Sequence, residues 1–540
     1  MIEVSGIRIP LSALKGDELA ACRRALAHKL HVSEGDLVHV ERRRRSIDAR
    51  KRGNVQLTFT LRAELAPSAR PRLDKSVRVV DERPFTFPAP VAHAGSRPVI
   101  VGAGCAGLFC ALSLARAGLE PLLVERGDDA ARRSEAVRRH NETGELDVES
   151  NIQFGVGGAG TFSDGKLQTG TRSPAHRLIL ETLVAAGAQP QILWDAKPHV
   201  GSDVLPHVVT DIVRQIEAAG GEVRTRCRMV DLDTTDDAVR GVTLVTTDPD
   251  GTEREERVLT DCVILACGHS ARDVFELLRD RNVTMERKTF AMGVRIEHLQ
   301  ADVDRALYGP AAGHPALGAA PYSLSCHLPS GRSAFSFCMC PGGYVVSAAS
   351  EPGGVCTNGM SLSDRAGTNA NSGLLANVFP EDLPGDDVLA GVELQRSCER
   401  AAFAAGGGAY VAPAQLVGDF LQRAPSSAGG RVRPTYPRGV AWGDVAPCLP
   451  PYIAETLREA IPVLGRKLRG FDATDAVLTG VETRSSSPVR VTRGDDGQSV
   501  STRGLWPVGE GAGYAGGIMS AATDGILAAE KIVASLSSAS

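Results

Sequence analysis

Three glycine-rich segments of this sequence have the G-x-G-x-x-G spacing that lets a backbone approach the pyrophosphate of a dinucleotide. They are GAGCAG at Gly102–Gly107, GVGGAG at Gly155–Gly160 and GAGYAG at Gly511–Gly516. A glycine triplet alone is weak evidence. A complete site also needs a strand before the turn, a helix after it and an acidic residue at the end of the next strand. The flanking residues therefore decide which segment binds a nucleotide.

The first segment has all of these flanking elements. The apolar strand PVIV leads into Gly102, and the helix LFCALSLARAG follows Gly107. Gly104 lets the backbone approach a pyrophosphate, to which the helix N-terminus offers free N–H groups and a positive dipole. The next strand, PLLVE, ends at Glu125, whose carboxylate can accept both ribose hydroxyls and disfavours a 2′-phosphate. This segment therefore predicts an FAD or NAD site and excludes an NADP site.

The middle segment lacks such neighbours. The residues before it, ELDVESNIQF, are acidic and contain no sustained apolar run. The residues after it, TFSDGKLQTGTRSP, contain glycine and proline at positions that prevent a long helix. Two interpretations remain open. The segment is either a plain flexible loop or a loop that closes over a cofactor bound by the first segment, where Thr161 and Ser163 can donate hydrogen bonds.

The third segment starts a helix near the end of the sequence. The strand GLWPVGE precedes it and AGGIMSAATDGILAAEKIVASL follows it, but no second strand comes after. A helix N-terminus at this place in a flavoprotein stabilises the anionic reduced flavin, and Glu510 suits a ribityl hydroxyl. The alternative is a glycine-rich helix start without a ligand.

Several side chains near these segments are candidate catalytic groups. His269 follows the strand CVILACG, where strand ends meet a cofactor crevice, although a structural hydrogen-bonding role is also open. Lys166 and Tyr514 are further candidates, because their segments would approach the flavin ring. Arg295 and Glu297 alternate onto one face of a strand, which favours an ion pair between them. We assign none of these side chains as the catalytic base.

Twelve cysteines are scattered along the chain, and their spacing matches no zinc site. Cys105 and Cys110 have the C-x4-C spacing of disulfide reductases. They fall in the turn and helix of the first segment, where residues five apart point in different directions, so we reject a disulfide relay. Cys338 and Cys340 share one face if they lie in a strand, and buried packing is the favoured interpretation of that pair.

Composition limits the class of protein. The chain has 540 residues, a net charge of −4 and 43% hydrophobic residues, which indicates a globular protein without general affinity for nucleic acid. No apolar run approaches the roughly 18 residues that span a bilayer, and the first residues lack a signal-peptide pattern. We therefore expect a cytoplasmic protein with a small-molecule substrate, no metal and no membrane partner.

One basic run, ERRRRSIDARKRG at Glu41–Gly53, departs from this balance. It could contact RNA or another polyanion, which would make the chain an RNA-binding or partner-binding flavoprotein. The run contains no aromatic residue that could stack on a base. The favoured interpretation is a solvated turn, or a contact between domains that uses Asp48.

The sequence resembles a largely uncharacterised family of bacterial FAD-dependent dehydrogenases or oxidoreductases. This family belongs to the FAD superfamily of para-hydroxybenzoate hydroxylase and glutathione reductase. The segments that carry the resemblance run through nearly the whole chain: SIDARKRG, VIVGAGCAGLFCALSLARAGLEPLLVER, NIQFGVGGAGTFSDGKLQTG, CVILACGHSARD, FAMGVRIEH, FSFCMCPGGYVVSAASE, TNGMSLSDRAGTNANSGLL, VETRSSSPVRVTR and WPVGEGAGYAGGIMSAATDGI. The resemblance is specific for the fold and for FAD, and it specifies no substrate.

The resemblance implies FAD contacts at particular positions. The glycines of the first segment would contact the pyrophosphate, Glu125 and Arg126 the adenosine ribose, and the residues around Glu510 the ribityl chain and ring. The superfamily usually has Asp at the position of Glu510, so that contact differs by one methylene. For GVGGAG the resemblance implies a loop beside FAD. The expected FAD-binding residues are Gly102, Gly104, Cys105, Ala106, Gly107, Glu125, Arg126, Gly157, Gly158, Thr161, Gly268, Gly509, Glu510, Gly517 and Ile518.

The predicted fold class is α/β, with a Rossmann-type FAD-binding domain, an inserted β-rich substrate domain and a small N-terminal α+β domain. Residues 1–90 contain the N-terminal domain and its connector, and residues 97–287 the first part of the FAD-binding domain with a β-meander. Residues 288–477 form the substrate domain, and residues 478–540 complete the FAD-binding domain.

We expect the chain to transfer hydride between a small organic substrate and flavin N5. The alternative is an FAD-dependent oxygenase that acts on an aromatic or indolic precursor in a biosynthetic pathway. The sequence contains no complete second dinucleotide fold. Electrons would therefore come from the substrate itself or from NADPH or NADH that binds transiently.

Overall fold

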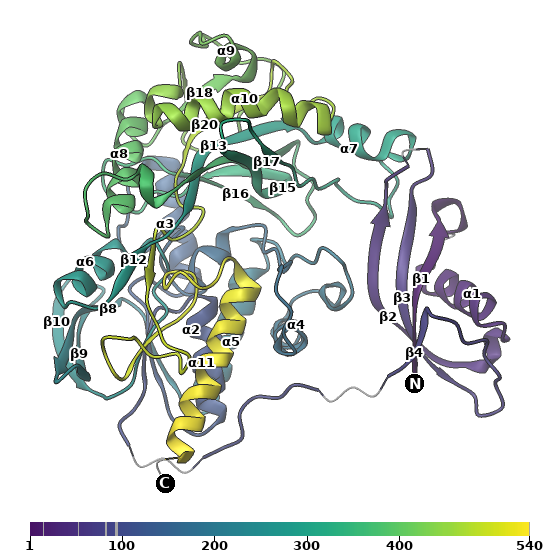
Figure 1. Ribbon diagram of the computed structural model, residues 1–540, viewed down its shortest axis with the longest axis horizontal. Coiled ribbons are helices and arrows are strands. Elements are labelled where there is room, and N and C mark those ends of the chain that lie inside the picture. The colour runs from purple at the N-terminus through teal and green to yellow at the C-terminus, as the bar shows by residue number, and fades with distance from the viewer. Residues whose placement is uncertain (15, 52, 81–83, 92–94, 539–540) are drawn as a thin grey trace.

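The computed structural model describes residues 1–14, 16–51, 53–80, 84–91 and 95–538. In Figure 1 a small N-terminal sheet lies to one side, a parallel sheet with helices lies below, and a larger mixed sheet lies above it. The predicted α/β fold class, with a Rossmann-type domain, is confirmed. Among the described helices, none is both long and apolar enough to cross a membrane.

The N-terminal sheet has the strand order β2-β3-β1-β4 and carries one helix. On β3 the alternating side chains of Leu57 and Phe59 are buried in the same cluster as Leu26 and Leu30 of the helix. This follows from the period of two in a strand and the spacing of four on a helix face. The elements are β1 (Ile2–Pro10), α1 (Glu18–Leu30), β2 (Leu37–Asp48), β3 (Gln56–Leu65) and β4 (Val77–Val79).

The basic run lies mostly on strand β2 and contacts another part of the chain, so the prediction of a solvated turn is wrong for these residues. The Arg45 N–H donates to the carbonyl oxygen of Trp194 at 2.7 Å, and its carbonyl accepts from Ala196 at 2.8 Å. The Arg42 guanidinium stacks over the Trp194 ring at 4.3 Å. The run therefore docks the N-terminal sheet on the following domain. Arg52 of the run lies outside the described residues.

The predicted use of Asp48 as a domain contact is also wrong. Asp48 accepts two hydrogen bonds from the Arg50 guanidinium, at 2.8 and 2.6 Å, within the same run. Arg42 and Arg45 each donate to the Glu18 carboxylate of α1 at 2.9 Å. Part of the positive charge of the run is thus neutralised inside the N-terminal domain.

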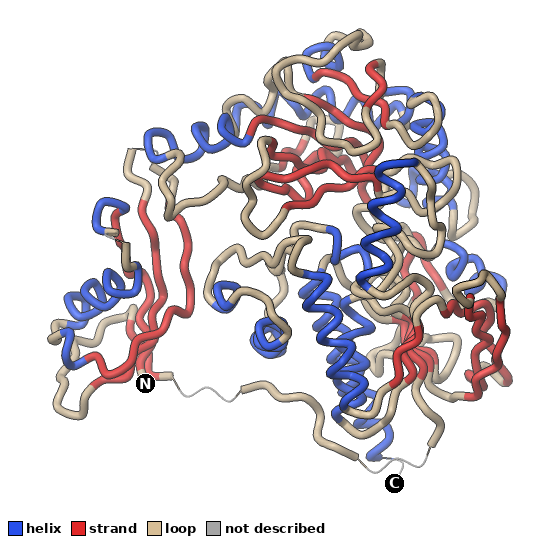
Figure 2. The backbone as a smooth tube through the Cα atoms, turned by 180° about the vertical axis from the view of Figure 1, so that it is seen from behind, coloured by secondary structure: helices blue, strands red, loops and turns tan. Residues whose placement is uncertain are grey.

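The parallel sheet has the order β22-β11-β5-β6-β7. Its side chains alternate between two cores: Ile100 and Ile264 join the helix side, while Val101 and Leu265 join the side of a second, antiparallel sheet. Figure 2 shows this layering of helices, sheet and meander. The strands are β5 (Val99–Val101), β6 (Leu122–Val124), β7 (Glu222–Arg224), β11 (Val263–Leu265) and β22 (Leu505–Pro507); the meander is β8 (Cys227–Thr235), β9 (Ala238–Thr247) and β10 (Glu253–Leu259).

The helices of this part are α2 (Cys105–Arg116), α3 (Ala130–Thr143), α4 (Ala175–Ala185), α5 (Leu205–Ala218), α6 (Arg272–Asp280) and α11 (Ile518–Ser538). Two glycines let α2 approach its neighbours closely. A Cβ on Gly107 would lie 1.9 Å from the carbonyl oxygen of Gly102, and one on Gly525 of α11 would lie 2.2 Å from that of Ala106. The start of α2 is therefore in tight contact with both strand β5 and helix α11.

The larger sheet has the order β14-β15-β17-β13-β20-β18-β19, and β16 pairs with β15. Helix α10 packs on β13 and β17. Strand β20 extends beyond the predicted domain end at residue 477, and we propose that the substrate domain continues through Glu482. The elements are β13 (Phe290–Leu299), α7 (Gln300–Tyr308), β14 (Ser325–His327), β15 (Ser333–Ser347), β16 (Thr357–Ser361), β17 (Asn369–Val378), α8 (Ala390–Ala405), β18 (Ala412–Leu416), α9 (Val417–Leu421), β19 (Val440–Trp442), α10 (Pro451–Lys467) and β20 (Val477–Glu482).

A short two-stranded sheet of β12 (Met285–Arg287) and β21 (Val489–Val491) lies where the chain enters and leaves the larger sheet. The two connections between the parallel sheet and the larger sheet therefore lie beside each other. The larger sheet is an insertion between β11 and β22 of the parallel sheet.

Candidate functional site

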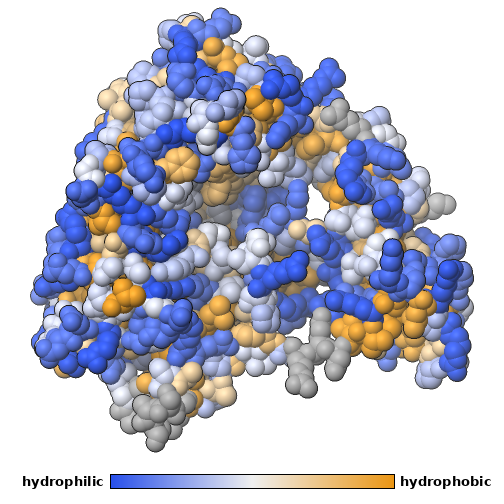
Figure 3. Space-filling model, viewed as in Figure 1, coloured by the Kyte–Doolittle hydropathy of each residue, from blue (hydrophilic) through white to orange (hydrophobic). Residues whose placement is uncertain are grey.

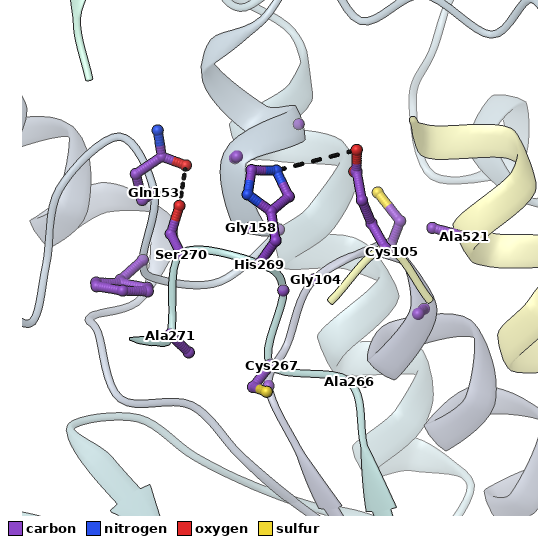
Figure 4. A pocket seen from close by; sticks show the side chains of 18 of the residues that line it. Gly104, Cys105, Gln153, Gly158, Ala266, Cys267, His269, Ser270, Ala271 and Ala521 are labelled. Carbon is purple, nitrogen blue, oxygen red and sulfur yellow. Dashed lines mark hydrogen bonds and ion pairs between the residues drawn. The ribbon is translucent and has the colours of Figure 1, made fainter. Parts of the chain in front are cut away.

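A cavity lies where the carboxyl ends of β5, β6 and β11 meet the larger sheet, the place where parallel α/β sheets bind ligands. Its wall also includes the start of α11, parts of residues 153–168, two residues at the bulge inside β15 and residues at the end of β20. Figure 3 shows that the face of the molecule is hollowed near its centre, and Figure 4 shows some of the side chains that line the cavity.

The turn after β5 presents a helix N-terminus to the cavity. Gly104 is the N-cap of α2, and no side chain caps this helix. A Cβ on Gly102 would lie 2.6 Å from the carbonyl oxygen of Ala266, whereas one on Gly104 would meet its nearest atom, the Gly158 Cα, at 3.9 Å. The turn is closed toward β11 and open toward the cavity, as a pyrophosphate site requires.

Glu125 at the end of β6 holds this turn in place. Its Oε2 accepts from the N–H of Ala103 at 2.8 Å, and its Oε1 accepts from the N–H groups of Gly127 and Gly155 at 2.9 Å each. Carboxylate oxygens have about four lone-pair directions in all, so one remains at Oε2. The prediction that Glu125 is free to accept both ribose hydroxyls therefore needs correction, because backbone N–H groups occupy most of its capacity.

The GVGGAG segment lies directly on the first glycine segment. The Gly157 N–H donates to the carbonyl oxygen of Ala103 at 2.8 Å, and a Cβ on Gly158 would lie 3.0 Å from the Gly104 Cα. Within the described residues, no strand occurs between β6 and β7. This contact favours the interpretation of GVGGAG as a loop that covers the first segment over an independent nucleotide site.

Arg133 of α3 fixes this loop from the interior. Its guanidinium is fully buried and donates to the carbonyl oxygens of Asn151, Ile152, Gly155 and Val156 at 2.8–3.3 Å. Burial lowers the pKa of Arg133 to about 10, and no carboxylate bonds to it in the described residues. Four backbone acceptors thus compensate the buried charge and hold the loop rigidly beside the cavity.

Arg126 forms the wall of the cavity next to Glu125. Its guanidinium stacks over the Phe154 ring at 4.3 Å and pairs with Glu149 at 2.7 Å and Asp273 at 2.8 Å. The side chain is therefore held flat by one ring and two carboxylates.

The third glycine segment brings Glu510 and the start of α11 to the cavity. Glu510 Oε2 accepts from the Gly517 N–H at 3.5 Å, and Oε1 lies 4.0 Å from Nε2 of His269. Burial raises the pKa of Glu510 to about 7. Burial, followed by the positive charge of Arg484, lowers the pKa of His269 to about 3, so this imidazole is neutral. Its buried Nδ1 has no hydrogen-bond partner among the described residues.

Lys166 stands at the other end of the cavity. Its Nζ lies 3.2 Å from the fully buried carboxylate of Asp164 and 3.8 Å from the sulfur of Cys340. Arg365 donates to both oxygens of the same carboxylate at 3.0 and 2.5 Å. Burial opposes the charge of Asp164, but Lys166 and Arg365 lower its pKa to about 2. Lys166 therefore shares one counter-ion with Arg365.

Arg295 and Glu482 form a buried ion pair, so the predicted pairing of Arg295 with Glu297 is wrong. The Arg295 guanidinium also donates to the carbonyl oxygen of Cys338 at 3.0 Å. Glu297 instead accepts from Asn369 at 3.0 Å and from Thr435. Strand β13 is buried on both faces, and its neighbour β20 supplies Glu482.

Cys338 and Cys340 lie at a bulge of β15. Cys338 lines the cavity and has a φ of 42°, whereas Cys340 is fully buried. Neither forms a disulfide, and Cys105 and Cys110 are also free thiols. Buried packing thus describes Cys340 but not Cys338.

A buried ionic cluster joins the parallel-sheet domain to the larger sheet near the cavity. Glu399 of α8 binds Arg272 of α6 at 2.8 Å and Arg484 at 2.7 Å, and Arg484 reaches the cavity wall. Burial would raise the pKa of Glu399, but the two guanidinium groups lower it well below its ordinary value. The cluster holds the two domains in one arrangement around the cavity.

The structure brings most of the residues expected at FAD to one cavity. Those that line it are Gly102, Gly104, Cys105, Ala106, Glu125, Arg126, Gly157, Gly158, Gly268, Glu510, Gly517 and Ile518, and the candidates His269 and Lys166 line it too. Gly107, Thr161 and Gly509 do not line it. Tyr514 does not line the cavity, because its phenol ring stacks on the Arg493 guanidinium at 3.9 Å. The expectation that Tyr514 approaches the flavin ring therefore needs correction.

Sequence reasoning missed several residues of the cavity wall, among them Phe154, Asn358, Glu482 and Arg484. Glu482 and Arg484 occur in VETRSSSPVRVTR, one of the segments that carry the family resemblance. The resemblance singled out this segment but did not show where it lies in the structure. Its position beside Arg295 follows from the pairing of β13 with β20, which the sequence does not show.

These residues fit the FAD that the resemblance implies. The turn contains Gly102 and Gly107, at both of which a Cβ would collide with backbone atoms, and the helix N-terminus that faces the cavity has no side-chain cap. The Nδ1 of His269, which has no partner among the described residues, offers a further polar contact. The donors and acceptors suit a dinucleotide with an unmodified ribose, and the described residues contain no cluster that could hold a metal ion.

Comparisons with known proteins support this fit. Residues 289–485 match the family described as "FAD-dependent protein, C-terminal domain-like", residues 100–162 match an NAD(P)-binding Rossmann-like domain, and residues 1–64 match a domain of unknown function. An uncharacterised protein of Clostridium beijerinckii is 40% identical over 538 residues, which are 98% of each chain.

Solved structures resemble the chain more distantly. A geranylgeranyl bacteriochlorophyll reductase-like protein from Thermoplasma acidophilum is 12% identical, over 82% of this chain and 79% of that one, with a TM-score of 0.37. The glycerol-3-phosphate dehydrogenase from Bacillus halodurans, complexed with FAD, is 11% identical over 83% and 65%, with a TM-score of 0.35. Likenesses this low do not identify a reaction.

Proposed function

We propose that this chain, which belongs to the family of FAD-dependent proteins that includes the C. beijerinckii relative, transfers hydride between a small organic substrate and flavin N5. FAD is its cofactor, and the protein is a flavoprotein of the oxidoreductase type. The observation that carries the proposal is one continuous cavity, which is lined both by the helix N-terminus at Gly104 and by ionisable groups such as Lys166 and Glu510.

The glycine end of the cavity would hold the nucleotide part of FAD. The turn at Gly102 and Gly104 would receive the pyrophosphate at the N-terminus of α2. Glu125 has one lone pair left, which can accept a single ribose hydroxyl. The start of α11 at Gly517 would add N–H groups near the ring.

The other end of the cavity supplies groups that bind and orient a substrate. Bound FAD supplies a two-electron acceptor for hydride, and this chain provides the surrounding charges and proton donors. Glu510 has a pKa near 7, so its carboxyl group can hold or release a proton at neutral pH. The neutral His269 can accept or donate one hydrogen bond without changing charge. Lys166 presents an ammonium group, 30% exposed, that suits an oxygen of the substrate.

The proposal is tested by mixing the purified holoprotein anaerobically with candidate metabolites, NADH and NADPH while the flavin absorbance is recorded. Bleaching by an organic metabolite alone supports direct hydride transfer to the flavin. Bleaching by NADH or NADPH, followed by oxygen uptake that depends on a second compound, would instead indicate an oxygenase. A protein that retains no FAD would contradict the assignment of the cavity.

A matched pair of variants localises the chemistry. Lys166→Gln should slow flavin reduction by at least about tenfold, because it removes a charge from the cavity end. Lys197→Gln removes a charge outside the cavity wall and should leave the rate unchanged. Equal effects of the two variants would mean that Lys166 acts through general charge and not at the substrate.

A further inference from the structure

Lys166 and Arg365 share one buried carboxylate, that of Asp164. Arg365 donates to both oxygens of this carboxylate, and the Lys166 Nζ lies 3.2 Å from one of them. Among the described residues, neither cation forms an ion pair with another carboxylate. Two positive charges therefore face one negative charge in a place that is largely withdrawn from water.

The arginines that line the cavity leave no such excess. Each binds at least one carboxylate: Arg126 that of Glu149, Arg228 that of Glu253 and Arg484 that of Glu399. Arg272 also binds Glu399, but Arg272 has a second carboxylate in Glu351. Among the described residues of the wall, Lys166 is thus the cation whose charge the protein leaves uncompensated.

Glu510 is a carboxyl group of the same wall and would repel an anion. It lies at a different element, because it accepts from the Gly517 N–H at the start of α11, whereas Lys166 contacts Asp164. Burial raises the pKa of Glu510 to about 7, so this group carries a proton about half of the time at neutral pH. Glu482, also in the wall, is neutralised by its buried ion pair. Glu510 therefore offsets the charge of Lys166 only in part.

Asn358 adds a hydrogen-bond donor to this wall. Its Oδ1 accepts from the Arg295 guanidinium and from the Gly359 N–H, at 2.8 Å each, which orients the NH₂ group of the amide away from Arg295. Asn358 is partly buried and lines the cavity, and its NH₂ group has no acceptor among the described residues. This group is therefore available to a ligand.

The bulge of β15 brings Lys166 and Asn358 to the same part of the wall. The Lys166 Nζ lies 3.8 Å from the sulfur of Cys340. The Arg295 guanidinium, which holds Asn358, donates to the carbonyl oxygen of Cys338 at 3.0 Å. An ammonium group and an amide NH₂ group together suit the two oxygens of a carboxylate.

Phe337 gives the wall an apolar surface next to the same bulge. It precedes Cys338, lines the cavity and is 37% exposed. An exposed aromatic ring inside a cavity is stabilised when an apolar group displaces water from it. The wall therefore favours a ligand that joins a carboxylate to an apolar body.

We propose that the substrate of this cavity is a small carboxylate with an apolar body. Its carboxylate binds the Lys166 ammonium and the Asn358 NH₂ group, and its apolar part packs on Phe337. This inference rests on the proposed function, because it names the chemical class of the compound that exchanges hydride with the flavin.

Benzoate and benzamide test the proposal, because they have the same ring and nearly the same shape but differ in charge. Their binding to the FAD-loaded protein is measured by equilibrium dialysis at about pH 7.5. We expect benzoate to bind with a dissociation constant at least about tenfold lower than that of benzamide. Equal affinities, or no binding of benzoate up to about 50 mM, would overturn the proposal.

Acetate tests the apolar part, because it has the carboxylate without the ring. It should bind at least about tenfold more weakly than benzoate. Equal affinities of acetate and benzoate would overturn the packing of the substrate on Phe337.

A matched pair of lysine variants locates the carboxylate. Lys166→Gln should raise the dissociation constant of benzoate at least about tenfold and leave that of benzamide within about twofold. Lys197→Gln removes the same charge outside the cavity wall and should change neither constant. If the charge of Lys166 instead serves the flavin ring, Lys166→Gln will leave the ratio of the two affinities unchanged, and that result overturns the proposal.

Asn358→Asp is a second variant that keeps the shape of the side chain. One oxygen can still accept from Arg295, while the other puts a negative charge in place of the NH₂ donor. Benzoate should then bind at least about tenfold more weakly, whereas benzamide, whose amide can donate to the new oxygen, should bind at least as tightly as before. Equal changes for the two compounds would contradict a carboxylate at Asn358.

These binding measurements contain no redox step, so this inference and the proposed function can fail separately. Binding of benzoate as expected, in a protein whose flavin no metabolite reduces, would contradict hydride transfer alone. Reduction of the flavin by a neutral metabolite, in a protein that does not bind benzoate, would contradict the carboxylate site alone.

Discussion

Substitution of Glu125 by Gln is expected to lower the free energy of unfolding by about 2–4 kcal/mol, because it weakens the hydrogen bonds that hold the turn after β5. The carboxylate accepts three backbone N–H groups, two at Oε1 and one at Oε2. A glutamine amide has only one acceptor oxygen, so its NH₂ group must face at least one of these donors. The variant loses one charge-assisted hydrogen bond, worth about 1.5–3 kcal/mol, and leaves a buried N–H unpaired at a further cost of about 1–3 kcal/mol. Partial relaxation of the loop would make the total loss of stability smaller than the sum of these two contributions.

The assay is urea unfolding of the FAD-loaded protein, together with the dissociation constant for FAD. The three donors come from the turn after β5, from Gly127 after β6 and from GVGGAG. Because the first and last of these segments form the wall of the cavity, the variant should lose FAD affinity by at least about thirtyfold as well as stability. Glu149→Gln is the matched control: its carboxylate pairs with Arg126 but is 23% exposed, so its loss should cost less than about 1 kcal/mol. Equal stability and FAD affinity for Glu125→Gln and the wild type would refute this account of the turn.

Three further outcomes follow from the structure. Gly525→Ala should destabilise the protein by about 1–3 kcal/mol in thermal unfolding, although alanine is normally favoured in a helix, because its Cβ would lie 2.2 Å from the Ala106 carbonyl oxygen; a stabilised variant would contradict the tight contact of α11 with α2. Glu510 has a folded pKa raised from 4.5 to about 7, so stability should fall as pH rises between these values, and Glu510→Gln should flatten that part of the profile by about 2–3 kcal/mol; an unchanged slope in urea titrations would exclude this carboxyl as the source. Arg295→Met should cost about 3–5 kcal/mol by leaving Glu482 buried without its partner, and the double variant Arg295→Met with Glu482→Met should recover most of the loss, which a double-mutant cycle measures.

The end of the cavity proposed to hold the nucleotide could be located from the sequence because its signal is local. A strand, a glycine turn, a helix and a terminal acid follow one another within the span from Val99 to Glu125, and these residues meet through short connections. The same local reasoning showed that GVGGAG lacks a strand and a helix of its own. Local reasoning could not show that backbone N–H groups occupy most acceptor positions of the Glu125 carboxylate, because one donor, Gly155, is 30 positions away in the sequence.

The basic run shows a different limit. Its charges indicated exposure, but strand β2 extends through Arg42 and Arg45 and pairs with the chain at Trp194. A run of arginines in a strand alternates its side chains between two faces, and each long side chain can stack on a ring or reach a carboxylate while its backbone bonds elsewhere. Charge density alone therefore does not distinguish a solvated turn from a domain contact.

The substrate end of the cavity depends on strand order, which no local pattern encodes. Arg295 and Glu297 share one strand face, yet the partner of Arg295 comes from β20, which pairs with β13 after an insertion of nearly two hundred positions. Cys338 faces the cavity because a bulge in β15 gives it a positive φ and separates its exposure from that of Cys340. A sequence pattern of alternating residues assumes a regular strand, so it assigns both thiols the same environment. The irregularity of that strand is what gives one cysteine access to the cofactor cavity while the other remains buried beside Lys166.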